Sequence, residues 1–212
     1  MPPDERFPPG FFDQAYTVVP GWEIGRPQPD LVGLLDEFPP SGRIVDVGCG
    51  TGALAVALGL RGHSVLGVDL AAKAIEKANA ALAQVPGAAK DLVSFRVADG
   101  LALSELGPPF GAVIDSGFYH LFGDADREQF VRQLVATLGP GGRYYLLGFA
   151  VEGNYPNAPR QVTLPELTAR FSPADGWRVL ALRTAGFLST VRPEPIPATL
   201  ACFERTVVGG TP

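Results

Sequence analysis

The stretch Asp46-Val47-Gly48-Cys49-Gly50-Thr51-Gly52 decides the fold, because it joins two apolar runs of different character. Residues 44–47 are short and β-branched, which predicts a buried strand, whereas residues 53–60 are rich in the helix formers Ala and Leu. Glycines between a strand and a helix permit a tight turn and a close approach of the backbone to a ligand. The stretch therefore predicts a strand, a binding loop and a helix, although the glycines alone would also suit an ordinary turn.

The alternation of strands and helices continues through the middle of the chain. Further strands are predicted at residues 64–69, 93–97, 111–115 and 143–149, and helices at residues 71–84 and 124–138. Short apolar strands that alternate with helices indicate right-handed crossovers and a largely parallel sheet with helices on both faces.

The C-terminal part of the chain has a different pattern. Thr163 and Glu166 have capping-box spacing for a helix that extends to residue 171, and strands follow at residues 177–182 and 198–207 with no helix between them. Two such strands pair antiparallel. The sequence therefore predicts an α/β fold, a Rossmann-like and largely parallel seven-stranded sheet with helices on both faces and a C-terminal antiparallel hairpin.

The composition narrows the classes of function. The chain has 212 residues, a net charge of -5 and no basic stripe, so a nucleic-acid partner is not expected. Its longest strongly apolar run, residues 53–60, is too short for a membrane span, which predicts a cytoplasmic protein. Cys49 and Cys202 lack metal-ligand or disulfide spacing, so no metal site is expected. We expect a single domain that is a monomer or a homodimer.

Two acidic residues close predicted strands beyond the glycine loop. Asp69 lies 23 residues after Asp46, at the end of the second strand, where a carboxylate can accept hydrogen bonds from both hydroxyls of a ribose. The same carboxylate could instead cap the helix that begins near Ala71. Asp99 closes the third strand in a similar way, with an ordinary Asp-Gly turn as the alternative.

These features resemble the class I S-adenosylmethionine (SAM)-dependent methyltransferases. The shared pattern is Asp-x-Gly-x-Gly-x-Gly at residues 46–52, an acid at Asp69 and Ala98-Asp99 at the end of the third strand, and the likeness extends from Trp22 to Arg205. Residues 21–29 (GWEIGRPQP) and 114–120 (IDSGFYH) are similar to the thiopurine, thiol and halide methyltransferases and, more closely, to the heterocyclic toxin methyltransferases.

The resemblance implies that the chain binds SAM and releases S-adenosylhomocysteine. It implies that Gly48 and Gly50 face the methionine part, that Asp69 holds the ribose, that Ala98 and Asp99 contact the adenine and that Trp22 helps to cover the cofactor. The complete predicted cofactor set is Trp22, Asp46, Gly48, Cys49, Gly50, Gly52, Asp69, Leu70, Ala98, Asp99, Asp115 and Ser116. The resemblance also divides the chain into an N-terminal cap over residues 1–40, a cofactor-binding core over residues 41–150 and an acceptor side over residues 151–212.

The acceptor of the methyl group is expected to be a small molecule, with a hydroxyl oxygen favoured over sulfur, nitrogen or a halide by the resemblance alone. The predicted catalytic residues are His120, Asp115 and Tyr119, of which His120 would deprotonate or orient a hydroxyl. Phe118, Tyr119, Tyr155 and Arg26 are predicted to contact the acceptor. Each of these aromatic residues would also suit ordinary packing, and Arg26 a solvated surface.

Two other functions remain open from the sequence. Gly48-x-Gly50-x-x-Ala53 also satisfies the dinucleotide fingerprint of NAD-dependent oxidoreductases. Against that function, the C-terminal strand pair is unlike a second nucleotide-binding half, and no Tyr-x-x-x-Lys follows the fourth or fifth strand. A SAM-binding domain without catalytic activity is the other alternative.

Overall fold

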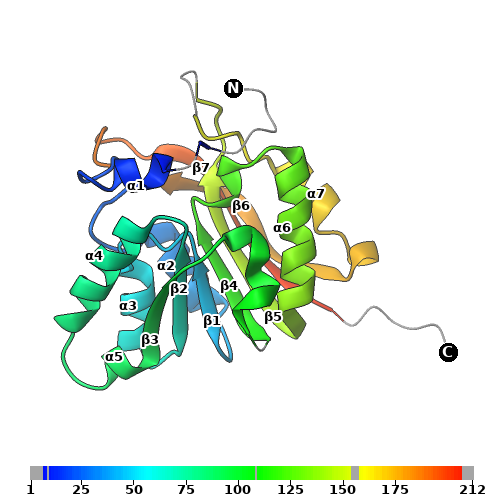
Figure 1. Cartoon of the computed structure of the whole chain (residues 1–212). Helices are drawn as coiled ribbons and strands as arrows, with labels where there is room; N and C mark the ends of the chain where they lie inside the picture. The colour runs from blue at the N-terminus through cyan, green and yellow to red at the C-terminus, as the bar shows by residue number, and fades with distance from the viewer. Residues whose placement is uncertain (1–6, 9, 108, 154–157, 207–212) are drawn as a thin grey trace.

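The strands form one seven-stranded sheet in the computed structural model, which describes residues 7–8, 10–107, 109–153 and 158–206 (Figure 1). In spatial order the strands are β3 (Val93–Val97), β2 (Val65–Asp69), β1 (Ile44–Val47), β4 (Phe110–Ser116), β5 (Leu138–Phe149), β7 (Ile196–Arg205) and β6 (Trp177–Phe187). The pairs from β3 to β5 are parallel, and β7 is antiparallel to both β5 and β6. The predicted fold class is confirmed.

Helices cover both faces of this sheet. The α-helices are α1 (Phe11–Ala15), α2 (Pro29–Glu37), α3 (Ala53–Leu60), α4 (Ala72–Ala83), α5 (Ala89–Leu92), α6 (Asp124–Thr137) and α7 (Leu164–Arg170), and the 3-10 helices are η1 (Gly100–Leu106), η2 (Tyr119–Leu121) and η3 (Pro173–Asp175). The sequence predicted α3, α4, α6 and α7 and missed α1, α2 and α5. In α2 a proline stands at the first position, where its missing N–H costs nothing, and Leu31, Leu34 and Leu35 face the core.

Two hydrophobic cores lie on opposite faces of the sheet. Along β5, Tyr144 and Leu146 belong to the core with Phe130 of α6, whereas Tyr145 and Leu147 belong to the core with α2 and α3. Successive side chains of a strand point to opposite faces, so one apolar strand contributes to both cores. This double burial explains why β1, β4 and β5 read as nearly continuous apolar runs.

The last strands differ in length from the prediction. β5 begins at Leu138, five residues earlier than expected, because Leu138 pairs with Phe110 before a register shift. β6 extends to Phe187 instead of residue 182, because β7 offers it a continuous antiparallel partner as far as Ile196. The extension matters because it brings the end of β6 to the carboxyl edge of the parallel strands. In the part of the chain that the structure describes, no helix is long and apolar enough to cross a membrane.

Candidate active site

A pocket of about 950 Å³ lies at the carboxyl ends of β1 to β5. This is where ligands bind in open parallel sheets, and the volume is near the upper end of the ~300–1,000 Å³ that is typical of small-molecule sites. Thirteen of the predicted site residues line it. They are Trp22, Arg26, Asp46, Gly48, Cys49, Gly50, Asp69, Leu70, Ala98, Asp99, Ser116, Phe118 and His120.

The glycine loop between β1 and α3 requires its glycines. Gly48 and Gly50 have φ angles of +66° and +55°, a region that side chains other than glycine rarely adopt. A Cβ at Gly48 would lie 2.9 Å from the Phe118 ring, and one at Gly50 would lie 2.8 Å from the hydroxyl of Tyr16. Bare backbone therefore faces the pocket. Between the two glycines, burial raises the pKa of the Cys49 thiol, so Cys49 is a packed side chain rather than a reactive one.

Asp69 forms hydrogen bonds at the start of α4, in agreement with one of its two predicted roles, and it also lines the pocket. Its Oδ2 accepts a hydrogen bond from the Gly50 N–H at 2.9 Å, and its Oδ1 accepts one from the N–H of Ala71, the N-cap residue of α4, at 2.9 Å. The carboxylate thus ties the glycine loop to the start of α4 and also lines the pocket. Each oxygen has a second lone pair, so both remain able to accept a hydroxyl hydrogen from a ligand.

Asp46 carries a buried oxygen without a partner. It is 2% exposed and lines the pocket, and its Oδ2 has no hydrogen-bond partner among the described residues. Burial raises the pKa of Asp46 to about 8, with further contributions from the nearby carboxylates of Asp69 and Asp115. An unpaired carboxyl oxygen in such a place is costly unless a ligand supplies a donor or a positive charge.

The third strand ends in the turn that the sequence suggested. The Asp99 side chain accepts a hydrogen bond from the Leu101 N–H at 2.9 Å and caps η1, while Asp99 and Ala98 line the pocket. The turn and the site are therefore compatible. Leu70 lines the same end of the pocket and is 57% exposed.

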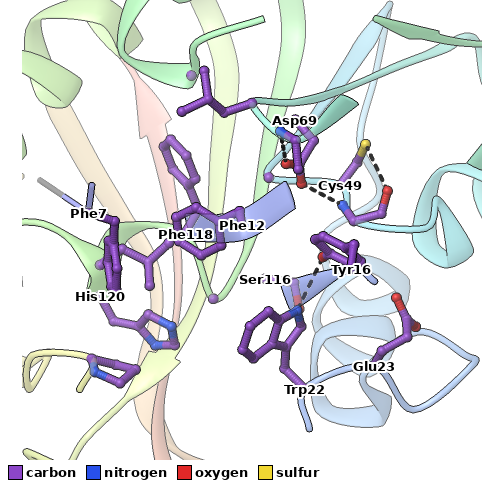
Figure 2. A pocket seen from close by; sticks show the side chains of 18 of the residues that line it. Phe7, Phe12, Tyr16, Trp22, Glu23, Cys49, Asp69, Ser116, Phe118 and His120 are labelled. Carbon is purple, nitrogen blue, oxygen red and sulfur yellow. Dashed lines mark hydrogen bonds between the residues drawn. The ribbon is translucent and has the colours of Figure 1, made fainter. Parts of the chain in front are cut away.

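The N-terminal segment closes over the glycine loop. The Trp22 indole N–H donates to the Tyr16 hydroxyl at 3.1 Å (Figure 2). The Glu23 carboxylate accepts from the Thr51 hydroxyl at 2.6 Å. Trp22 is still 42% exposed at the rim of the pocket. The contact between Glu23 and Thr51 thus ties the segment to the glycine loop, and a single mutation can remove it.

Several lining residues were missed by the sequence analysis. They are Phe7, Phe12, Tyr16, Glu23, Phe149 and Phe187. Phe12 and Tyr16 have the four-residue spacing of one helix face, a signal too short to predict α1 and its role. Phe149 and Phe187 end β5 and β6, and their proximity depends on the antiparallel pairing of both strands with β7.

Aromatic side chains form the other end of the pocket, away from the acidic residues (Figure 2). The ring centroids of His120 and Phe149 are 4.5 Å apart, and those of Phe149 and Phe187 are 5.0 Å apart. The ring of Phe118 packs against Gly48 of the glycine loop and against Gly100 at the start of η1. One pocket therefore joins an acidic, glycine-lined end to an aromatic end.

Among the described residues that line the aromatic end, His120 is the one with a titratable side chain. Its Nδ1 accepts a hydrogen bond from the Phe149 N–H at 3.2 Å. Burial, together with the positive charge of Arg127, lowers the pKa of His120 to about 3. The imidazole is therefore neutral at physiological pH.

Two predicted catalytic residues do not line the pocket. Asp115 is buried beneath it and accepts hydrogen bonds from the N–H groups of Phe118 and Tyr119 and from the Tyr144 hydroxyl, at 2.7, 2.9 and 2.8 Å. Burial raises the pKa of Asp115 to about 6, against the effect of these hydrogen bonds. Asp115 therefore shapes the turn that presents Phe118 and His120.

Tyr119 faces the opposite way from its neighbours. Its hydroxyl donates to Glu166 at 2.9 Å, and the guanidinium of Arg127 lies over its ring. The prediction that Tyr119 contacts the acceptor is wrong, because adjacent residues in this turn point to opposite sides and Phe118 and His120 occupy the pocket side.

Two further predicted residues have other positions. Gly52 does not line the pocket; it begins α3 with a φ of +82° and packs against the Phe95 ring. Tyr155 lies outside the described residues. Arg26 is the only Lys or Arg among the described residues that line the pocket, whereas five acids line it: Asp13, Glu23, Asp46, Asp69 and Asp99. The charge balance suits a positively charged ligand.

Comparisons with known proteins find methyltransferases. The model of a methyltransferase domain matches residues 44–142. The chain is 34% identical over 158 residues to the 2-heptyl-1-hydroxyquinolin-4(1H)-one methyltransferase of Mycobacteroides abscessus, which covers 73% of this chain and 67% of the relative. It is 27% identical over 146 residues to probable thiol methyltransferase 2 of Arabidopsis thaliana, with 68% of this chain and 63% of that protein covered. A structure solved in work on the conversion of a disulfide bond into a thioacetal group during echinomycin biosynthesis is 27% identical, with a TM-score of 0.78 and coverage of 94% and 92%.

Proposed function

This chain belongs to the class I SAM-dependent methyltransferases, and we propose that it methylates the hydroxyl oxygen of an aromatic or heteroaromatic small molecule. SAM is its cofactor and a small molecule its acceptor. The observation that supports the finer proposal is the aromatic end of the pocket, where His120, Phe149 and Phe187 adjoin the glycine loop. Flat apolar walls with one polar group favour a flat aromatic acceptor.

The residues at the acidic end fit SAM. The backbone at Gly48 and Gly50 would approach the methionine part, and the unpartnered Oδ2 of Asp46 would face its ammonium group. Asp69 would accept the hydroxyls of the ribose, and Ala98 and Asp99 would contact the adenine. The acids at this end also suit the net positive charge that the sulfonium and the ammonium give to the cofactor.

The main task of the protein in this reaction is to position the two reactants. SAM supplies a methyl group bound to a positively charged sulfur, and a nucleophile can attack the methyl carbon directly with the sulfur as leaving group. Phe118, which packs against the glycine loop and lines the same pocket as the aromatic residues, would help to orient the two reactants, and the aromatic wall would exclude water from between them. Alignment of two bound reactants can lower a barrier by about 7–11 kcal/mol. At the aromatic end, the His120 side chain would contact the acceptor.

A thermal-shift comparison of SAM, S-adenosylhomocysteine and NAD tests the cofactor. A ligand at 100 times its dissociation constant stabilises the folded state by about 2.7 kcal/mol, so SAM and S-adenosylhomocysteine should raise the melting temperature. NAD should leave it unchanged. A shift with NAD alone would contradict the assignment and restore the oxidoreductase alternative.

A screen of methyl transfer tests the acceptor atom. Phenols and hydroxyquinolines should be methylated on oxygen, with the product identified by mass spectrometry and NMR. Methylation of thiols or iodide alone would overturn the oxygen proposal in favour of the second candidate, a sulfur acceptor, which the thiol methyltransferase relative supports. Binding of SAM without turnover of any of these acceptors would favour a SAM-binding domain without catalytic activity.

A further inference from the structure

The two nitrogens of the His120 ring have different partners. The Phe149 N–H donates to Nδ1 at 3.2 Å, so Nδ1 is occupied as an acceptor. A neutral imidazole carries one hydrogen, and this hydrogen must then lie on Nε2. Nε2 is therefore a donor, and it has no lone pair with which to take a proton from an acceptor molecule.

The surroundings of His120 oppose a second proton on the ring. Phe149 of β5 and Phe187 of β6 pack against the imidazole and contribute no charge. Arg127 of α6 is the charged side chain that opposes a positive charge on the imidazole. The Arg160 backbone N–H donates to the His120 carbonyl oxygen at 2.7 Å, while the Arg160 guanidinium lies 3.6 Å from the Asp124 carboxylate. The pKa of about 3 agrees with this geometry, because burial and Arg127 both disfavour the imidazolium.

Arg127 is fixed in position by a buried ion pair. It is 2% exposed and contacts both carboxylate oxygens of Glu166 at 2.8 Å, and Glu166 also accepts from Arg170 and from the Tyr119 hydroxyl. This buried network holds the cation in place behind the turn that carries His120. The neutral state of the imidazole is therefore built into the packing of α6 and α7.

We propose that His120 acts on the acceptor as a hydrogen-bond donor through Nε2–H and not as a general base, so that the acceptor reacts as an anion that has already lost its proton to water. The inference rests on the proposed function, because it concerns an acceptor with an ionisable hydroxyl. It selects the substrate class: acceptors whose own pKa lies near or below the working pH, such as acidic phenols and N-hydroxy heterocycles.

The reaction balances without a proton on the protein. An electron pair of the anionic oxygen forms the new O–C bond, the bond between the methyl carbon and sulfur breaks, and its electron pair remains on sulfur. The Nε2–H stabilises the bound anion before the transfer, since a hydrogen bond to a charged oxygen is stronger than one to a neutral oxygen. Binding should therefore lower the pKa of the acceptor.

A spectral titration tests this step without turnover. 4-Nitrophenol absorbs visible light as the anion, so its ionisation can be followed in the complex of the full chain with S-adenosylhomocysteine. We expect its pKa to fall on binding by about one unit, a tenfold change in ionisation. His120→Ala should abolish the fall, and His120→Gln, which keeps an N–H donor and an acceptor for Phe149, should retain much of it. An unchanged or raised pKa in the wild-type complex, or no binding of the phenol, would overturn the proposal.

The dependence of kcat/KM on pH supplies a second test that needs no variant. For a series of substituted phenols, the inflection should follow the pKa of each phenol. A general base on the protein would instead produce one inflection common to all of them, and that result would overturn the donor role while leaving oxygen methylation intact. Failure of the proposed function has a different signature, which is the absence of any O-methylated product.

Discussion

The two ends of the pocket are built by different parts of the chain. The acidic end comes from Asp46, the glycine loop and Asp69, which lie close together in the sequence and are joined by short hydrogen bonds such as that from Gly50 to Asp69. The aromatic end collects Phe7, His120, Phe149 and Phe187 from four distant segments. The first end depends on local geometry and the second on packing. Substitutions at the aromatic end can therefore change the acceptor and leave cofactor binding intact.

A clasp joins the two ends. The Gln28 side chain donates to the Leu188 carbonyl at 2.9 Å and accepts from the Leu188 N–H at 2.8 Å. Nearby, the Thr190 N–H donates to the Gly21 carbonyl at 2.8 Å. The segment that carries Trp22 is thereby fastened to the end of β6, which carries Phe187. If the two ends are independent, loss of this clasp should weaken the binding of the acceptor more than the binding of the cofactor.

The largest effect is expected from Asp69→Ala at the acidic end. The change leaves the Gly50 and Ala71 N–H groups without their acceptor and removes the proposed ribose contact. Hydrogen bonds to charged groups contribute about 1.5–3 kcal/mol, so the affinity for S-adenosylhomocysteine should fall about 10- to 150-fold by calorimetry. Asp36→Ala, which removes an exposed carboxylate, is the control. An unchanged affinity in a folded Asp69 variant would remove this residue from the site.

Asp46→Asn should change stability and binding in opposite directions. Burial raises the pKa of Asp46 from 3.8 to about 8 in the folded chain, so its contribution to stability is lost as the pH rises from about 4 to 8. Asparagine does not ionise, and the ligand-free variant should gain melting temperature relative to the wild type as the pH increases. Its affinity for S-adenosylhomocysteine should fall about tenfold, because a charged partner for the ammonium is lost.

Thermal scans at pH 6 and pH 8.5, with calorimetry at both, measure the two effects of Asp46→Asn. A variant whose melting temperature differs from that of the wild type by the same amount at both pH values would show that Asp46 is not the group that titrates.

Gln28→Ala should affect the KM for the acceptor more than the affinity for the cofactor. The loss of two neutral hydrogen bonds, each of about 0.5–1.5 kcal/mol, loosens the end of β6. We expect the acceptor KM to rise about 3- to 10-fold while the affinity for S-adenosylhomocysteine changes less than about twofold. Gln28→Glu keeps the acceptor for the Leu188 N–H and should have an intermediate KM. Equal losses for both ligands would show that the two ends are not independent.

The smallest effect is expected from Thr51→Val, which removes the contact with Glu23. The N-terminal segment should open more often, and the affinity for S-adenosylhomocysteine should fall about two- to fivefold. In the wild type, hydrogen exchange of residues 11–28 should slow when S-adenosylhomocysteine binds, and the variant should show a larger change. Exchange that is independent of the ligand in both proteins would contradict a role of this segment as a cover.

The local parts of the fold were readable from the sequence. β1, the glycine loop, α3 and the acid that ends β2 follow from apolar runs, glycine spacing and the position of Asp69, all within about one strand–helix–strand unit. α2 escaped prediction because its apolar stripe is short and its start is marked only by a proline within a proline-rich segment.

Which side chains of the turn after β4 reach the pocket was decided by tertiary structure. The sequence offers Phe118, Tyr119 and His120 alike as pocket residues. In the structure, Asp115 accepts hydrogen bonds from the backbone of this turn, and the Tyr119 side chain contacts Glu166 and Arg127 instead of the pocket. The direction of a side chain in a turn depends on partners that are far along the chain, which periodicity does not encode.

The sequence alone determined the fold class and predicted the glycine loop and the acids around it as the cofactor site, because these depend on backbone conformation and on residues close together in the chain. Tertiary structure alone decided that Phe149 joins His120, that the Phe149 N–H occupies Nδ1, and that Gln28 fastens the N-terminal segment to β6. These contacts join residues that are 29 and 160 positions apart. They exist only after the sheet has brought its strand ends together, and they set the chemistry of the acceptor end.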